Sequence, residues 1–208
     1  HGYRKGSHTG WNSLDEYYKP RRGEVTIITG IPSHGKSEFL DALMVNLAKG
    51  EDAWMFSVFS PENYPLERHF AKISEKYIGK PFQGKYRMGI SDIDLCLDWG
   101  SNHFHFICPN EATDAFNLDN IIDVITTSVY RHGISGAVID PWNDLDHCIA
   151  DTLTETQYIA KALVKLRNLA RRKDIHIWIV AHPKMLNKDK NGEYPIPTPY
   201  DISGSANW

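Results

Sequence analysis

The chain has 208 residues, of which 41% are hydrophobic and 24% charged, and its formal net charge is −3. This composition excludes a largely disordered chain, and the length is enough for one domain with a sizeable core. No apolar run approaches the roughly 20 residues that a membrane-spanning helix needs, and the first residues show no secretory signal pattern. The acidic balance gives no general support for nucleic-acid binding, so any such contact must come from local loops.

The cysteines predict a reducing compartment. Cys96, Cys108 and Cys148 are odd in number and form no Cys-x-x-Cys pair. This usage favours small buried side chains over a disulfide framework or a cysteine metal site.

Apolar runs typical of buried strands alternate with helical patterns along the whole chain. Strands are predicted at residues 24–29, 53–59, 103–107, 134–140 and 175–181, and helices at residues 38–48, 65–77, 91–99, 117–130 and from 154 onwards. Residues 79–90 contain several Gly and Pro residues and predict a loop. This alternation predicts an α/β fold with a mostly parallel central sheet and helices on both faces.

Local signals mark the later helices. Asn117 is a plausible N-cap, and Thr154 with Gln157 forms a capping-box pattern. The basic residues 171–173 suit a solvated helix C-terminus. One face of that last helix carries the apolar residues Ile159, Leu163, Leu166 and Ala170.

The most specific motif follows the first predicted strand. Residues 30–37 fit the P-loop pattern of Gly, four residues and Gly-Lys-Ser, between a strand and a helix. The backbone N–H groups of such a loop, together with the helix N-terminus, bind phosphate oxygens. We expect Lys36 to reach the β- and γ-phosphates and Ser37 to hold Mg²⁺. The predicted nucleotide-binding residues are Gly30, Ile31, Pro32, Ser33, His34, Gly35, Lys36 and Ser37.

Polar residues at three other strand ends are candidates for chemistry, because ligands bind beyond the carboxyl ends of parallel strands. Asp140 suits a Walker B acid that helps to hold Mg²⁺, with a turn or cap aspartate as the alternative. Glu62 could activate the attacking water or be a first-turn helix acid. His182 could sense the γ-phosphate or have only a structural partner.

Two loops at the same edge of the sheet are candidates for contact with DNA. Residues 183–200 contain Lys184, Lys188 and Lys190, which suit either phosphate-backbone contacts or a solvated surface loop. Residues 141–146 include Trp142, which could stack on a base or pack against the core, and Asn143.

Taken in order, these motifs resemble the RecA-type core of the hexameric replicative DNA helicases. That family includes the bacterial DnaB, mitochondrial Twinkle and phage primase-helicase types, and the likeness covers residues 9–208. The motifs that carry it, besides the P-loop, are residues 10–15, Ser60-Pro-Glu-Asn63, Val138-Ile-Asp140, Ile179-Val-Ala-His182 and residues 201–206.

The resemblance implies an NTP-dependent helicase motor that couples hydrolysis to translocation on single-stranded DNA. It implies Glu62 as the general base, His182 as the γ-phosphate sensor, and the loops after Asp140 and His182 as the DNA loops. The implied cofactors are Mg²⁺ and ATP, or another NTP or dNTP. The implied assembly is a homo-oligomer, a hexameric ring in the complete protein, with no membrane association and a cytoplasmic location in a bacterial or phage-infected cell, or a mitochondrial one.

The expected domain organisation is a lead-in segment at residues 1–22 followed by a RecA-like core at residues 23–208. The family's last motif continues past residue 208, and its arginine finger lies farther on, so a fragment is expected. Two alternatives share the P-loop: a RecA-like recombinase or other ring- or filament-forming ATPase, and an interaction domain that nucleotide orders without hydrolysis. A small-molecule kinase is less favoured, because no Arg-rich lid segment is present.

Overall fold

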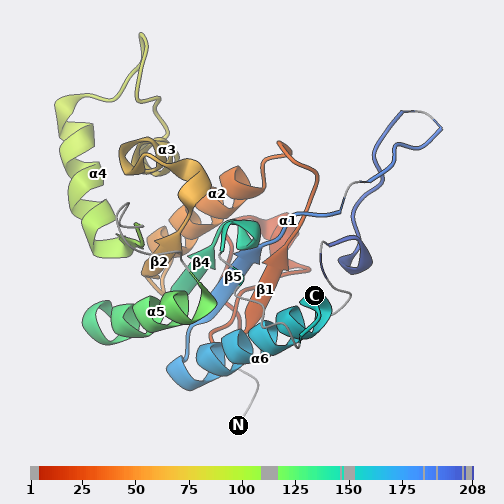
Figure 1. Cartoon of the computed structure of the whole chain (residues 1–208). Coiled ribbons are helices and arrows are strands. Elements are labelled where there is room, and N and C mark those ends of the chain that lie inside the picture. Colours follow the sequence, from red (N-terminus) through yellow and green to blue (C-terminus); the bar gives the residue numbers. More distant parts are fainter. Residues whose placement is uncertain are drawn as a thin grey trace.

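The structure is a computed structural model that describes residues 5–108, 117–145, 147, 153–184, 186–190, 192–202, 204 and 208. Within these residues the centre of the fold is a five-stranded sheet with the strand order β1-β5-β4-β2-β3 (Figure 1). All neighbouring strands run parallel. The strands are β1 Val25–Ile28, β2 Phe56–Phe59, β3 Phe104–Phe106, β4 Gly136–Ile139 and β5 His176–Val180.

The three inner strands are buried along their whole length, which explains why their sequences are continuous apolar runs rather than alternating ones. Their register brings the carboxyl ends together at one edge, since Phe59 pairs with Ile139, which pairs with Ile179. Ile28 of β1 lies beside Val180 of β5 at the same edge. Whatever follows each of these strands therefore emerges close to the others.

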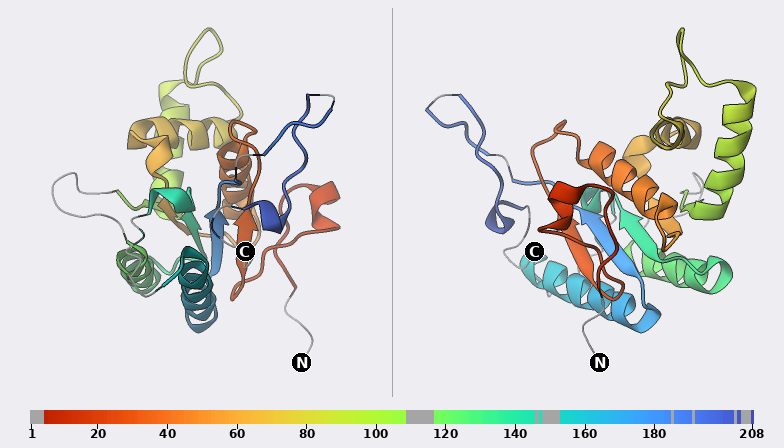
Figure 2. Two further views of the ribbon diagram at one scale, coloured as in Figure 1. Left: turned by 45° about the vertical axis from the view of Figure 1, so that its right-hand side comes forward. Right: turned by 180° about the vertical axis from the view of Figure 1, so that it is seen from behind.

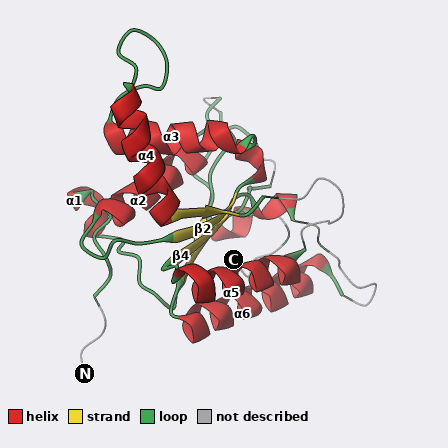
Figure 3. Ribbon diagram, turned by 90° about the vertical axis from the view of Figure 1, so that its left-hand side faces the viewer, coloured by secondary structure: helices red, strands yellow, loops and turns green. Residues whose placement is uncertain are grey.

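Helices cover both faces of the sheet, as Figure 3 shows from the side. Helices α2 (Lys36–Lys49), α3 (Leu66–Ile78) and α4 (Ile90–His103) lie on one face, with α3 packed on α2 and α4 on α3. Helices α5 (Leu118–His132) and α6 (Glu155–Lys173) lie side by side on the other face. Short elements complete the described fold: α1 (Asn12–Asp15) and the 3-10 turns η1 (Pro61–Asn63), η2 (Trp142–Asp144) and η3 (Pro199–Asp201).

Two apolar cores follow from the period of two along the strands. Val138, Trp178 and Val180 pack on the α2 side, whereas Ile139 and Ile179 pack on the α5–α6 side. The predicted apolar face of α6 is buried in the second of these cores. The predicted α/β fold is confirmed.

Most predicted elements are present, with shifted ends. The Asn117 side chain caps α5 by accepting from Asn120 N at 2.9 Å, and Thr154 and Gln157 form the predicted capping box. Helix α4 is longer than predicted and includes His103, which was expected to begin a strand, so β3 is short. Helix α2 begins earlier than predicted, at Lys36.

The described part of the lead-in segment packs against the core. Thr9 is fully buried, and its carbonyl accepts from Asn46 Nδ2 of α2 at 2.9 Å. Trp11 stacks on Phe39 of α2, with ring centroids 5.5 Å apart. The loop between β5 and η3, by contrast, stands away from the rest of the chain in both views of Figure 2. None of the described helices is long and apolar enough to cross a membrane.

Candidate active site

Four neighbouring strands each deliver one candidate residue to the same edge of the sheet. Lys36 follows the loop after β1, and His182 lies two residues beyond β5. Asp140 comes directly after β4, and Glu62 lies in η1, which follows β2. Since these strands are neighbours in the order β1-β5-β4-β2, the predicted residues come from one continuous stretch of sheet edge.

The P-loop has two residues in the left-handed backbone region. Gly35, the residue before α2, has a φ of 80°, which a residue with a Cβ adopts only with strain. Ser33 also has a positive φ, 64°, a feature that the sequence did not reveal. Gly30 is not in this region. Of the two glycines in the motif, Gly35 is therefore the one whose backbone conformation requires glycine.

Lys36 is turned back onto its own loop. Its Nζ donates to the carbonyl oxygens of Gly30, at 3.0 Å, and Ile31, at 3.2 Å. Burial lowers the pKa of Lys36, and the negative charges of Glu62 and Asp140 oppose that change. The negative charges of both carboxylates therefore act on the ammonium group, while neutral carbonyls accept its hydrogen bonds.

Asp140 is a buried carboxylate with incomplete hydrogen bonding. It is 3% exposed, and its Oδ2 accepts from Ser60 Oγ at 3.5 Å, whereas its Oδ1 has no hydrogen-bond partner. Burial raises the pKa of Asp140; the Ser37 hydroxyl opposes this rise, and Glu62 and Asp41 add to it. An unpaired buried carboxylate oxygen beside a hydroxyl is a donor set that suits a hard cation such as Mg²⁺.

Glu62 and His182 face each other across this edge. Their Oε1 and Nε2 atoms are 3.8 Å apart, and both side chains are partly exposed. The backbone N of His182 donates to Asn143 Oδ1 at 3.1 Å. Asn143, predicted as a DNA contact, thus also holds the residue predicted as the sensor.

One open cavity of about 390 Å³ joins these groups. Its lining includes Lys36, Ser37, Glu62 and His182, whereas Asp140 is buried and does not line it. Of the predicted nucleotide-binding residues, Pro32, Ser33 and Gly35 also line it, whereas Gly30, Ile31 and His34 do not. The structure brings together most of the predicted site.

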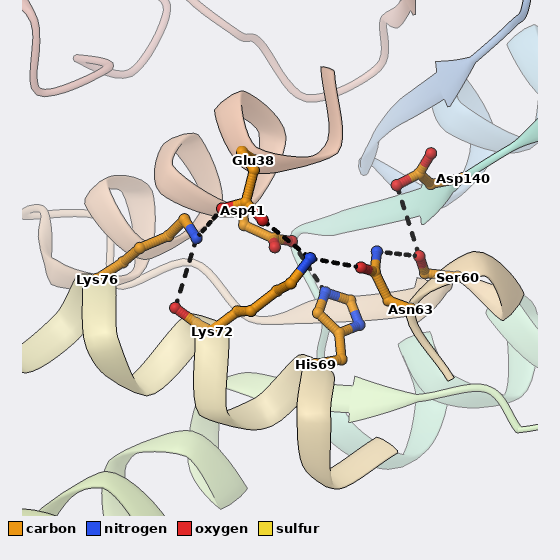
Figure 4. Close-up of polar contacts among 8 residues, drawn as sticks. All are labelled: Glu38, Asp41, Ser60, Asn63, His69, Lys72, Lys76 and Asp140. Atoms are coloured by element: carbon orange, nitrogen blue, oxygen red, sulfur yellow. Dashed lines mark hydrogen bonds and ion pairs between the residues drawn. The ribbon is translucent and has the colours of Figure 1, made fainter. Parts of the chain in front are cut away.

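A polar network lies on the α3 side of this cavity (Figure 4). Lys72 joins Glu38 of α2 to Asn63 of η1, and Asn63 in turn contacts Ser60, the residue that donates to Asp140. Beside this chain of contacts, the buried His69 Nε2 and Asp41 Oδ1 are 2.9 Å apart. Sequence reasoning assigned no role to Glu38, Asn63 or Lys72, although all three line the cavity.

The predicted DNA-contacting residues differ in exposure. Lys184, Lys188 and Lys190 are exposed, and Lys188 lies against the ring of Tyr194. Trp142 is only 3% exposed and packs edge-on against Trp208, so it takes the structural alternative and offers no open face for a base. The prediction that it stacks on DNA does not fit this arrangement.

Some predicted features fall outside the described residues. Asp146, Cys148 and parts of the last motif, at residues 203 and 205–206, are among them.

Comparison with known proteins supports the fold. The chain is 38% identical, over its whole length, to the Twinkle homolog protein, chloroplastic/mitochondrial, of Arabidopsis thaliana. It also superposes, over its whole length, on 51% of a solved chain described as a DnaB-like replicative helicase in a study of its interactions with primase, with a TM-score of 0.70 and 17% identity. The chain has the fold of a RecA-type core, and its sequence is similar to part of the Twinkle homolog.

This RecA-type core spans 29% of the length of the Arabidopsis relative. No family model matches the chain. The solved structure supports the fold, and the relative shows a similarity in sequence over the whole chain.

Proposed function

We propose that this chain is the motor domain of an NTP-dependent DNA helicase that acts in replication. It would bind Mg-NTP at the P-loop and couple hydrolysis to translocation on single-stranded DNA. The observation that carries the proposal is the convergence of Lys36, Glu62 and His182 on one cavity, together with the buried, incompletely bonded Asp140 directly after β4.

The residues present fit Mg²⁺ at this position. Ser37 and Asp140 supply a hydroxyl and a carboxylate oxygen, which are the hard donors that Mg²⁺ takes alongside water and phosphate oxygens. When bound, the ion would neutralise charge on the phosphates. Its arrival would also give the unpaired Oδ1 of Asp140 a partner.

The remaining roles follow from position. Lys36 would exchange the two loop carbonyls for phosphate oxygens, a stronger partner for an ammonium group. Glu62 is exposed enough to meet water and would accept its proton as the general base. His182, within 3.8 Å of Glu62, would report the presence of the γ-phosphate to the loop that follows β5.

The exposed lysines Lys184, Lys188 and Lys190 are proposed to contact the DNA backbone, and Asn143 to link that contact to His182. We propose ATP or another NTP or dNTP as the fuel, and a ring of identical subunits, six in the complete protein, as the assembly. The name of the relative supports an organellar location, while a cytoplasmic one in a bacterial or phage-infected cell stays a prediction.

The test is steady-state ATP hydrolysis, with and without single-stranded DNA, for the wild-type chain and for Glu62→Gln. We expect hydrolysis that DNA stimulates, and a loss of about 10²–10⁴-fold in the variant, because the substitution removes the base and keeps its shape. Glu67→Gln, at an exposed carboxylate in the first turn of α3, is the matched control. An unchanged rate in Glu62→Gln would assign the base elsewhere, and nucleotide binding without any turnover would favour an interaction domain that nucleotide orders.

A further inference from the structure

Lys72 of α3 lies at the active site although no motif marks it. Its Nζ lies 2.9 Å from Glu38 Oε1 of α2 and donates to Asn63 Oδ1 of η1 at 3.1 Å. The side chain is 29% exposed and lines the cavity that contains Lys36 and Glu62. One ammonium group therefore joins the P-loop helix to the turn that carries the predicted base (Figure 4).

The second contact continues into the site. Asn63 is 8% exposed, and its Nδ2 donates to Ser60 Oγ at 2.9 Å. Ser60 Oγ in turn donates to Asp140 Oδ2 at 3.5 Å. Since Ser60 and Asn63 flank Glu62 on its two sides, this chain of contacts fixes both ends of η1.

A neighbouring lysine shows what is particular to Lys72. Lys76 lies one turn farther along α3, and its Nζ contacts the other oxygen of Glu38 at 2.6 Å. Its other hydrogen bond goes to the Lys72 carbonyl of its own helix, and it does not line the cavity. The two lysines share an anchor, and only Lys72 is bonded to η1.

The anchor is charged at neutral pH. The hydrogen bond from Lys76, and then that from Lys72, lower the pKa of Glu38 to about 2 against the opposing effect of burial. A charge-assisted pair holds the Lys72 ammonium group in place more firmly than water would. The side-chain oxygen of Asn63 thus accepts from Lys72, and the Lys72 ammonium group is held in place by Glu38 of α2 rather than by η1 itself.

We propose that Lys72 is a positioning residue that holds η1, and through it Glu62 and Asp140, in the arrangement needed for hydrolysis. A base displaced by about 1 Å loses much of its effect, so a support of this kind acts on turnover more than on binding. The catalytic part of this inference rests on the proposed NTPase function. The positioning part is a property of the fold alone.

The first experiment measures positioning without any need for turnover. The amide groups of Asn63 and Tyr64 donate to Ser60 O and Pro61 O within η1, so their hydrogen exchange reports the opening of that turn. We expect Lys72→Met and Asn63→Ala each to speed exchange at these two amides by about tenfold or more. The double variant should exchange no faster than Asn63→Ala, because that variant already lacks the contact with Lys72.

Lys76→Met is the matched control, with an expected change within about twofold at the same amides. Lys72→Arg keeps a donor and should retain most of the protection. Equal exchange in Lys72→Met and Lys76→Met would overturn the proposal. Thermal unfolding of each variant shows whether any change is local.

The second experiment separates turnover from binding. With ATP we expect Lys72→Met to lower kcat by about tenfold or more, while the nucleotide Kd and KM change little. If the wild-type chain binds ATP and hydrolyses none, the proposed function fails, while the exchange data still decide whether Lys72 positions η1. If the wild type hydrolyses ATP and Lys72→Met keeps its full kcat, the catalytic part of the inference is wrong.

Discussion

Polar side chains at the two ends of the central strands differ in whether their hydrogen bonds are satisfied. At the amino end, buried and half-buried polar side chains form a continuous chain of hydrogen bonds. At the carboxyl end, buried polar atoms are left without partners beside an open cavity. Both ends belong to the same sheet and share its strands, so we interpret the first set of polar groups as serving the fold and the second as serving the proposed ligand.

At the amino end, the hydrogen bonds all run in the same donor-to-acceptor direction. Trp178 Nε1, which can only donate, donates to Tyr18 OH at 2.9 Å, and Tyr18 OH lies 3.0 Å from Thr26 Oγ1. Thr26 Oγ1 lies 2.8 Å from His176 Nε2, and His176 Nδ1 lies 2.6 Å from the Arg21 carbonyl, which can only accept. Neutral His176 with its proton on Nδ1 therefore satisfies every member.

The carboxyl end has the unpaired groups. Among the described residues, the buried side-chain atoms without a hydrogen-bond partner are Thr29 Oγ1, Asp41 Oδ2 and Asp140 Oδ1. Thr29 directly precedes the P-loop, Asp41 lies in α2 one turn after Ser37, and Asp140 directly follows β4. An unpaired buried group lowers stability, and its presence here is consistent with the nucleotide and metal site that we propose.

The largest effect is expected from removing the charge of Asp140, which tests whether this unpaired carboxylate serves activity rather than stability. We expect Asp140→Asn to lower ATP hydrolysis by about 10²-fold or more, because the amide is a weak donor to Mg²⁺. Stability should stay equal or rise by about 0.5–2 kcal/mol, because a buried charge with an unpaired oxygen is removed. Hydrolysis assays and urea unfolding measure the two effects. Asp144→Asn, at an exposed position, is the control, and a large loss of stability in Asp140→Asn would contradict this interpretation.

The second prediction concerns pH and the amino end. Burial lowers the pKa of His176 to about 4, with the hydrogen bond to Arg21 acting in the opposite direction. Between about pH 6.5 and pH 4 the unfolded chain binds a proton at this position that the folded chain does not. The free energy of unfolding should therefore fall as the pH drops through this window, by up to about 3 kcal/mol.

Urea unfolding at pH 7 and pH 4.5 tests this prediction. His176→Gln should lose most of the pH dependence in this window, because the variant has no group to protonate there. His8→Gln, at an exposed side chain, should retain it. The same slope in wild type and His176→Gln would show that another group is responsible.

The smallest expected effect is on stability and comes from a substitution in the hydrogen-bond chain at the amino end. Tyr18→Phe removes the hydroxyl that accepts from Trp178 and bonds Thr26, and should destabilise the protein by about 1–2 kcal/mol. Nucleotide affinity and kcat should not change, because the hydroxyl lies at the opposite end of the strands from the cavity. Thermal unfolding and nucleotide titration measure the two, and Tyr17→Phe, at an 87% exposed neighbour, is the control. A fall in nucleotide affinity would show that the two ends are coupled.

Much of the fold was predictable because the signals are local. The apolar runs of the inner strands, the cap at Asn117 and the capping box at Thr154 each depend on residues close together in the chain. The P-loop motif likewise located Lys36 and Ser37. The end of α4 was mispredicted, because His103 bonds the Trp54 carbonyl, a contact that local pattern does not contain.

Local sequence patterns were sufficient to predict the fold class, the P-loop and the polar residues that follow each strand. The folded chain was needed to show that the strands preceding Lys36, His182, Asp140 and Glu62 are neighbours, since strand order depends on packing between distant segments. It also placed Trp142 in the core rather than at the surface, and brought Lys72 to Asn63. These contacts join elements that lie far apart in the chain or on different helices, and no local periodicity records which side chains will meet across such an interface.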